Sequence, residues 1–176
     1  MRKIRNLVTN APSSVKIARN AEITGYQHLH PDKAYTVAKI GRTAGWTTGR
    51  VNAIGSTLCI RKDFASVVPV EFKKNDNKFD DVILVFGILA DDDTVAFVAP
   101  GDSGSVVLLN DGSSKKEGVA LGLGFAGNSA TSMSYMMPMS HIIRDIENIT
   151  GAKVMGFPDC GTAEGEDLAR RRVLDG

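Results

Sequence analysis

The sequence predicts an all-β domain, a closed or nearly closed antiparallel β-barrel followed by a C-terminal helix, and three observations lead to this prediction. Short stretches rich in β-branched and aromatic residues recur through the middle of the chain, separated by turn-forming residues. Glycine is plentiful, at 18 of 176 residues, and supplies those turns. A helical spacing of apolar residues appears late, after residue 139. Closure into a barrel gives many short strands their hydrogen-bond partners.

The expected strands are short and end at glycine, proline, asparagine or aspartate. In chain order they cover residues 35–40, 50–54, 57–60, 66–72, 82–89, 95–100, 105–110, 118–125 and 132–139. Pro69 marks its strand as an edge strand or a bulge, because proline has no N–H for the ladder. The pair Asp111 and Gly112 predicts a hairpin turn between the strands on either side of it.

The helix is predicted by four isoleucines that recur at spacings of three and four, namely Ile142, Ile143, Ile146 and Ile149. Ser140 is the expected N-cap, and Gly151 is the expected stop. We therefore divide the chain into three parts. An irregular N-terminal segment covers 1–34, the barrel domain with its helix covers 35–150, and a charged tail covers 151–176.

Composition argues against several classes of partner. A formal net charge of +1 disfavours a nucleic acid or an anionic membrane surface. The basic clusters at 115–116 and 170–172 lack the interleaved aromatic residues of a nucleic-acid surface. No apolar run reaches the roughly 18 residues of a membrane span, and the basic N-terminus lacks the apolar core of a secretory signal. The acidic run at 91–93 is expected to be a solvated turn.

No cofactor and no metal is expected. His28 and His30 have a spacing that places two imidazoles on one side of an extended strand, but no acid or cysteine cluster completes a metal site. The stretch GLGFAG lacks the strand–helix unit of a dinucleotide loop. Cys59 and Cys160 share no motif, which favours two reduced thiols over a disulfide.

The stretch VAPGDSGSVVLL (98–109) places Ser103 between two glycines at the start of an apolar strand. A serine hydroxyl becomes a nucleophile when a base takes its proton, and the oxyanion that forms at the attacked carbonyl needs donors already aimed at it. Gly101 and Gly104 permit the sharp turn that presents backbone N–H groups. A tight turn before a strand explains the same pattern equally well, so the local pattern leaves both interpretations open.

The longer context resembles the chymotrypsin-like serine peptidases, a family with two β-barrels. PGDSGS (100–105) resembles their nucleophile loop, and VAKIGRTAGWTTGRVNAI (37–54) looks like the first two strands of their C-terminal barrel, closest to short bacterial and fungal members. GVALGLGFAGN (118–128) resembles the glycine-rich edge of their substrate cleft, and SYMMPMSHIIRDI (134–146) resembles the last strand and helix. The resemblance implies that the chain holds the C-terminal half of such a double barrel, an antiparallel β-barrel of the six-stranded type with a C-terminal helix.

The resemblance also implies roles for individual residues. Ser103 matches the nucleophile, and the N–H groups of Gly101 and Ser103 match the oxyanion hole. Asp102 matches the buried acid that holds the loop in its active shape. One departure is Ser105, which stands where the family usually has a second glycine.

Substrate contacts are implied in the same way. Phe97 falls near the base of the primary specificity pocket, and because it is not an acid, an apolar or shallow pocket is expected rather than one for Lys or Arg. The pocket wall, where an extended substrate pairs with a strand edge, matches Gly124, Phe125, Ala126 and Gly127.

The base and its orienting acid are the main departure from the family. In that family the order is His, Asp, Ser, and the first two residues come from an N-terminal barrel. Such a barrel needs on the order of a hundred residues, but 34 residues precede Tyr35 here. His28 and His30 are candidate bases, although a solvated loop explains them more simply, and His141 is expected at the start of the helix.

Two functions follow as hypotheses. The first is a serine endopeptidase that hydrolyses peptide bonds through an acyl-enzyme on Ser103, with the His and Asp contributed by sequence outside this chain. The second is a catalytically inactive peptidase homologue that grips an extended peptide. The expected partners are a polypeptide and either an N-terminal barrel or a second copy, since half of a double barrel exposes an apolar face.

Overall fold

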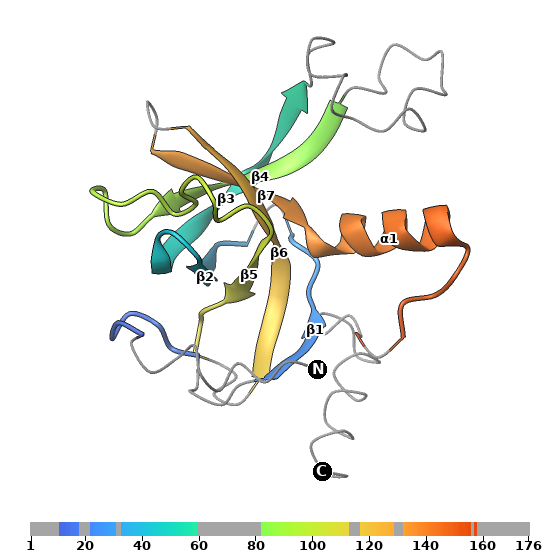
Figure 1. The fold of residues 1–176 in the computed structure, drawn as a ribbon, viewed down its shortest axis with the longest axis horizontal. Helices are drawn as coiled ribbons and strands as arrows, with labels where there is room; N and C mark the ends of the chain where they lie inside the picture. The colour runs from blue at the N-terminus through green and yellow to red at the C-terminus, as the bar shows by residue number, and fades with distance from the viewer. Residues whose placement is uncertain are drawn as a thin grey trace.

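The computed structural model describes residues 11–17, 22–30, 33–59, 82–112, 117–128, 132–155 and 157. These residues form seven strands and one helix (Figure 1). In chain order they are β1 (Glu22–Tyr26), β2 (Tyr35–Gly41), β3 (Gly45–Cys59), β4 (Val82–Ala90), β5 (Ser105–Leu109), β6 (Glu117–Asn128), β7 (Met133–Pro138) and α1 (Met139–Thr150).

Strands β2 to β7 close into an antiparallel barrel. The order is β6, β5, β2, β3, β4 and β7, and a further pairing between β6 and β7 completes the ring. Each strand in it therefore has a neighbour on both sides, which leaves no continuous exposed edge. The prediction of an all-β barrel followed by a C-terminal helix is confirmed.

Several details differ from the sequence-based expectation. The two strands expected at 50–54 and 57–60 form one strand, β3, because an irregularity between Val51 and Gly55 absorbs the change of register. Residues 22–26, in the segment expected to be irregular, form β1, which pairs parallel with the first part of β6 (Figure 1). The strand expected at 66–72 lies outside the described residues.

The segment 95–100 was expected to be a strand and instead forms a loop. Its apolar pattern reflects burial rather than pairing, because Phe97 and Val98 are buried in the core. Side chains satisfy part of its backbone: the hydroxyl of Thr47 donates to the Phe97 carbonyl at 2.9 Å, and the Val98 N–H donates to the hydroxyl of Ser134 at 2.9 Å. A buried loop needs such partners when no neighbouring strand supplies them.

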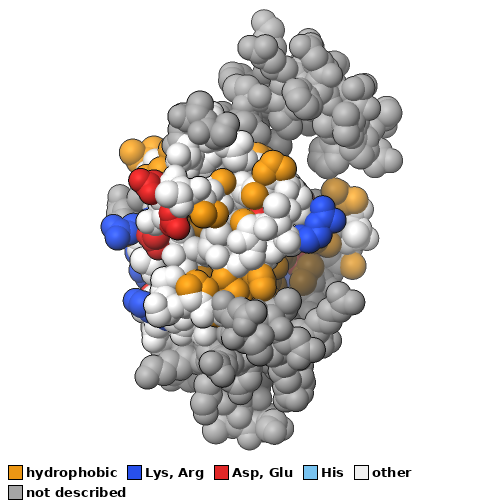
Figure 2. Space-filling model, turned by 60° about the vertical axis from the view of Figure 1, so that its left-hand side comes forward, with side chains coloured by type: hydrophobic (Ala, Val, Ile, Leu, Met, Phe, Trp, Pro, Cys, Tyr) orange, Lys and Arg blue, Asp and Glu red, His pale blue; other side chains and the backbone are white. Residues whose placement is uncertain are grey.

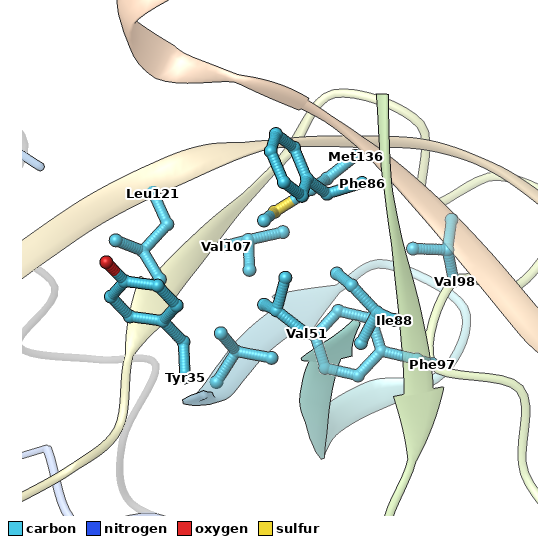
Figure 3. Packing of buried hydrophobic residues seen from close by; sticks show 10 residues of the cluster. Tyr35, Val51, Phe86, Ile88, Phe97, Val98, Val107, Leu121 and Met136 are labelled. Carbon is cyan, nitrogen blue, oxygen red and sulfur yellow. The ribbon is translucent and has the colours of Figure 1, made fainter. Parts of the chain in front are cut away.

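The core fills the inside of the barrel, with one inward-facing residue at every second position of a strand. On β2 the inward residues are Tyr35, Val37 and Lys39, all buried. Figure 3 shows the apolar cluster around them, which includes Val51, Phe86, Ile88, Phe97, Val98, Val107, Leu121 and Met136. A second cluster covers the outside of the barrel, where Ala38 of β2 packs near Ile17 and α1.

Helix α1 follows β7 directly and packs through Met139 and Ile143. The expected N-cap was Ser140, but the helix begins at Met139 with Pro138 as its N-cap, two residues earlier than expected, and no side chain caps it. The expected stop is confirmed, because Gly151 is left-handed and its N–H donates to the Glu147 carbonyl. Among the described residues, no helix is long and apolar enough to cross a membrane.

Candidate functional site

The loop that carries Ser103 begins with a tight turn. The Asp102 N–H donates to the Ala99 carbonyl at 2.9 Å, which closes a four-residue turn with Pro100 in its second position. Gly101, in the third position, has φ of +96°. Proline followed by a left-handed glycine is the residue pattern of a type II turn, so the sequence APGD dictates the shape of this loop.

Asp102 anchors the turn inside the barrel. Its carboxylate accepts hydrogen bonds from the Lys39 ammonium at 2.6 Å, the Thr43 N–H at 2.7 Å and the Ala99 N–H at 3.2 Å. The side chains of Lys39 and Asp102 are both fully buried. Three segments of the chain therefore meet at one carboxylate: the end of β2, the turn after it, and the Ser103 loop.

Burial and pairing act on the Asp102 carboxyl in opposite directions. Burial raises its pKa, but the hydrogen bond from Lys39, the N–H groups of Thr43 and Ala99, and the Lys39 charge together lower the pKa below its ordinary value. Asp102 is therefore held as a carboxylate. Its predicted place as a buried acid of the loop agrees with this geometry.

Sequence reasoning missed Lys39. The period of β2 carried the signal, because Tyr35 and Val37 face inward and the next inward position is Lys39. A lysine at an inward position requires a buried acid as its partner, and Asp102 is that acid. The Lys39 ammonium also lies 5.9 Å from the centre of the Phe97 ring.

Ser103 is exposed at the tip of the loop. Its hydroxyl donates to the Phe125 carbonyl at 3.0 Å, and the Gly104 N–H donates to the Gly124 carbonyl at 2.8 Å. Within the described residues, no protein acceptor takes the N–H of Gly101 or of Ser103. Two backbone donors thus stand beside an exposed hydroxyl, which is the composition of an oxyanion-binding site.

Ser103 lies at the edge of a pocket of about 480 Å³. One wall is the segment of β6 from Phe125 to Asn128, and the opposite wall is the loop before Ser103, including Val98 and Pro100. Three of the four predicted wall residues, Phe125, Ala126 and Gly127, line it. Gly124 lies behind the wall, where an added Cβ would approach Val98 to 2.8 Å.

Phe97 does not line this pocket, in contrast to its expected place near the pocket base. It is fully buried in the barrel core, because the loop turns its ring inward toward Lys39. Val95, Ala96 and Asp93 line the pocket in its place. Sequence reasoning missed Asp93, which comes from the acidic turn at 91–93. Figure 2 shows acidic side chains gathered at one side of a face that has apolar side chains in its middle.

The histidines lie elsewhere. His28 and His141 line a second pocket of about 280 Å³, together with Tyr26, Arg144 and Glu147, and this pocket shares no lining residue with the first. His30 is exposed, and its N–H donates to the Tyr35 hydroxyl at 3.1 Å. Neither candidate base lines the pocket that holds Ser103.

Burial lowers the pKa of His141, and the charges of Arg144 and His28 lower it further against the opposing charge of Asp145. In the described part of the chain, no three His, Cys, Asp or Glu side chains gather into a group suited to a metal ion. The polar groups at the first pocket therefore include the Ser103 hydroxyl, the Asp93 carboxyl and the end of β6, with the N–H groups of Gly101 and Ser103 in the loop at its edge.

Comparison with known proteins gives a likeness in fold. No family model and no curated protein matches the chain. Among solved structures, it is similar to the Rv3671c protease of M. tuberculosis H37Rv in its inactive form and in a serine-to-alanine mutant, and to the chymotrypsin of Cellulomonas bogoriensis.

These likenesses are distant. The TM-scores are 0.42, 0.42 and 0.44, and the sequence identities are 17%, 16% and 16%, in the order in which the structures are named above. The matches cover 76%, 80% and 77% of this chain and 53%, 55% and 56% of the solved chains. The chain thus spans about half the length of these structures, and the similarity to chymotrypsin-like serine peptidases is one of fold.

Proposed function

We propose that this barrel is the nucleophile-bearing half of a chymotrypsin-like serine endopeptidase site and acts on polypeptides. The observation that carries the proposal is Ser103, exposed beside the N–H groups of Gly101 and Ser103 at the edge of a 480 Å³ pocket. A hydroxyl, two backbone N–H donors and a side-chain pocket are the parts that acyl transfer requires.

The chemistry assigns one step to each part. The Ser103 oxygen attacks the carbonyl carbon of a peptide bond while its proton passes to a base, and the carbonyl oxygen takes the negative charge. The two N–H groups stabilise that oxyanion. The C–N bond then breaks, the amine leaves with the proton, and water hydrolyses the ester to restore the hydroxyl.

The end of β6 offers a place for an extended substrate. Pairing between β5 and β6 ends at Ser105 opposite Gly124, whereas pairing between β6 and β7 continues to Asn128. The β6 segment 125–128 therefore has a neighbour strand on one side and faces the pocket on the other. A peptide that adds to this edge directs alternate side chains toward the pocket.

The base comes, in this proposal, from a second barrel outside the described residues, as in the family that the sequence resembles. A second candidate function is peptide binding without hydrolysis. It is favoured by the hydrogen bond from the Ser103 hydroxyl to the Phe125 carbonyl, which uses the proton that a histidine would otherwise accept, and by the lack of any histidine among the lining residues of the pocket.

Labelling with a fluorophosphonate tests the proposal, because the serine oxygen displaces fluoride from phosphorus and an oxyanion-binding site favours this phosphonylation. We expect slow modification of Ser103, located by mass spectrometry, in excess of modification at Ser132, which lines the same pocket. The variant Ser103→Ala should lose the label. Equal labelling of the two serines would contradict the proposal, and rapid stoichiometric labelling of Ser103 would place the base inside this chain.

A further inference from the structure

Arg42 lies against the oxyanion-binding turn. A Cβ added to Gly101 would fall 3.0 Å from a guanidinium nitrogen of Arg42 and 2.7 Å from the Thr43 hydroxyl oxygen. The guanidinium therefore lies beside Gly101, whose N–H has no acceptor among the described residues. Arg42 itself is exposed and does not line the 480 Å³ pocket.

The charge of Arg42 has no partner in the described part of the chain. No carboxylate there forms an ion pair with it, and the nearest acid of the loop, Asp102, is already neutralised by Lys39 at 2.6 Å. The carboxylate of Asp102 is also fully buried. A ligand that reaches Gly101 from solvent consequently meets a positive charge that no described carboxylate pairs with.

A neutral peptide carbonyl and a free carboxylate differ in what they need at such a place. A carbonyl oxygen is satisfied by the two N–H donors. A carboxylate has a second oxygen and a full negative charge, and a guanidinium supplies N–H donors for that oxygen and a positive charge to balance it. Backbone nests combined with a strand edge are also a known means of holding the C-terminal end of a peptide.

We propose that this site binds the free C-terminal carboxylate of a polypeptide, with one oxygen at the N–H groups of Gly101 and Ser103 and the other at the Arg42 guanidinium. The proposal rests on peptide binding at the β6 edge, as proposed above. The last side chain of the ligand occupies the pocket, and the residues before it pair with β6 between Phe125 and Asn128.

The partner chemistry follows from the pocket walls. They are mainly apolar, with Val95, Val98, Pro100 and Phe125 among them, and Asp93 is the one acidic or basic side chain among the residues lining the pocket. An apolar final residue therefore fits the walls. A C-terminal acidic residue is excluded, because a second carboxylate would enter the pocket that contains Asp93.

Matched peptides test the inference. We would measure fluorescence polarisation with N-terminally labelled peptide pools that end in leucine, prepared once with a free carboxylate and once with a carboxamide. The wild-type chain should bind the carboxylate pool at least about tenfold more tightly, as expected for one charge-assisted contact. Arg42→Gln should remove most of that difference.

The control variant is Arg50→Gln, which removes another exposed arginine. Arg50 lies on β3, and its Nε is 3.6 Å from a carboxylate oxygen of Asp91. It should keep the preference for the carboxylate. Equal binding of both pools to the wild type, or no binding of either, would overturn the inference; the proposed function is judged separately by labelling at Ser103. Preference that persists in Arg42→Gln would also overturn it, because the guanidinium would then have no part in recognition.

Discussion

The two pockets of this barrel hold their polar groups in different ways. Beside the first pocket, the Ser103 loop is fixed from within by Asp102, whose carboxylate is fully buried and bonded to Lys39. In the second pocket, His28 is exposed and His141 is half-buried. The groups that could bind a substrate carbonyl are thus rigidly placed, whereas the imidazoles lie on the surface in a separate pocket.

This difference separates two requirements of acyl transfer. Oxyanion binding depends on backbone donors held in place before the substrate arrives, and here the buried ion pair of Lys39 and Asp102 anchors the loop that carries Gly101 and Ser103. Proton transfer depends on a base within hydrogen-bond reach of the nucleophile, and neither candidate histidine lines the pocket of Ser103. If the proposed function holds, the described residues supply the nucleophile and the N–H donors but not the base.

Removing Lys39 should produce the largest effect. Lys39→Met leaves the Asp102 carboxylate buried without its counter-charge, and breaking a buried pair in this way costs about 3–5 kcal/mol. We expect urea denaturation to show a loss of that order in the free energy of unfolding. Adding Asp102→Asn to Lys39→Met should recover much of the loss, because the uncompensated charge is then absent. A double variant as unstable as Lys39→Met alone would contradict this account.

Acid should weaken the same anchor. The pKa of Asp102 is lowered in the folded protein, chiefly because the Lys39 and backbone hydrogen bonds outweigh the effect of burial, whereas the unfolded value is about 3.9. Its contribution to stability is therefore complete above about pH 4 and is lost as the pH falls through the lower folded value.

The free energy of unfolding, measured by urea titration between pH 6 and 2, should fall less steeply in Asp102→Asn than in the wild type. Asp92→Asn is the matched control, since the pKa of exposed Asp92 is also lowered, by hydrogen bonds from Thr94. Because Asp92 is at the surface, Asp92→Asn should keep most of the wild-type dependence of the free energy of unfolding on pH. Identical slopes for wild type and Asp102→Asn would be inconsistent with a buried anchor.

The barrel was predictable from the sequence because its signals are local. Strand periods, glycine turns and the isoleucine spacing each reflect nearby residues, and the two strands expected on either side of Asp111 and Gly112 pair antiparallel as β5 and β6. The loop at 95–100 was mistaken for a strand because burial and pairing leave the same apolar pattern, and its partners, Thr47 and Ser134, are distant in sequence.

The site was predictable in part for the same reason. The turn around Gly101 is encoded by PGD, but Lys39, Asp93 and Arg42 reach the site from other segments. Their contribution depends on closure of the barrel, which brings β2 next to β5, and no spacing in one sequence reports such a contact. The inward position of Lys39 on β2 was the one signal available in advance.

The two loop glycines should separate backbone strain from steric contact. Gly104 has φ of +85° and open space where a Cβ would lie, so Gly104→Ala should cost about 1–2 kcal/mol for a left-handed non-glycine residue. Gly101→Ala adds contacts with Thr43 and Arg42 to the same strain. Urea denaturation should therefore find Gly101→Ala the less stable of the two. Equal losses in the free energy of unfolding would show that the Thr43 and Arg42 side chains move away from the new Cβ at no cost.

The smallest effect concerns the second pocket and asks whether the two regions are coupled. The pKa of His141 is lowered first by burial, then by Arg144 and His28, so His28→Gln should raise it slightly toward its ordinary value. An NMR titration of the His141 ring protons measures this shift. His30→Gln is the control and should leave the titration unchanged.

The same titration performed on Ser103→Ala decides the comparison of the two pockets. If the imidazoles were linked to Ser103 through a hydrogen-bond network, removing its hydroxyl would move the His141 pKa, because charges and hydrogen bonds within a few ångströms set that value. We expect no movement, since the pockets share no lining residue. A shift in Ser103→Ala would join the two regions into one site and return a histidine of this chain to the role of base.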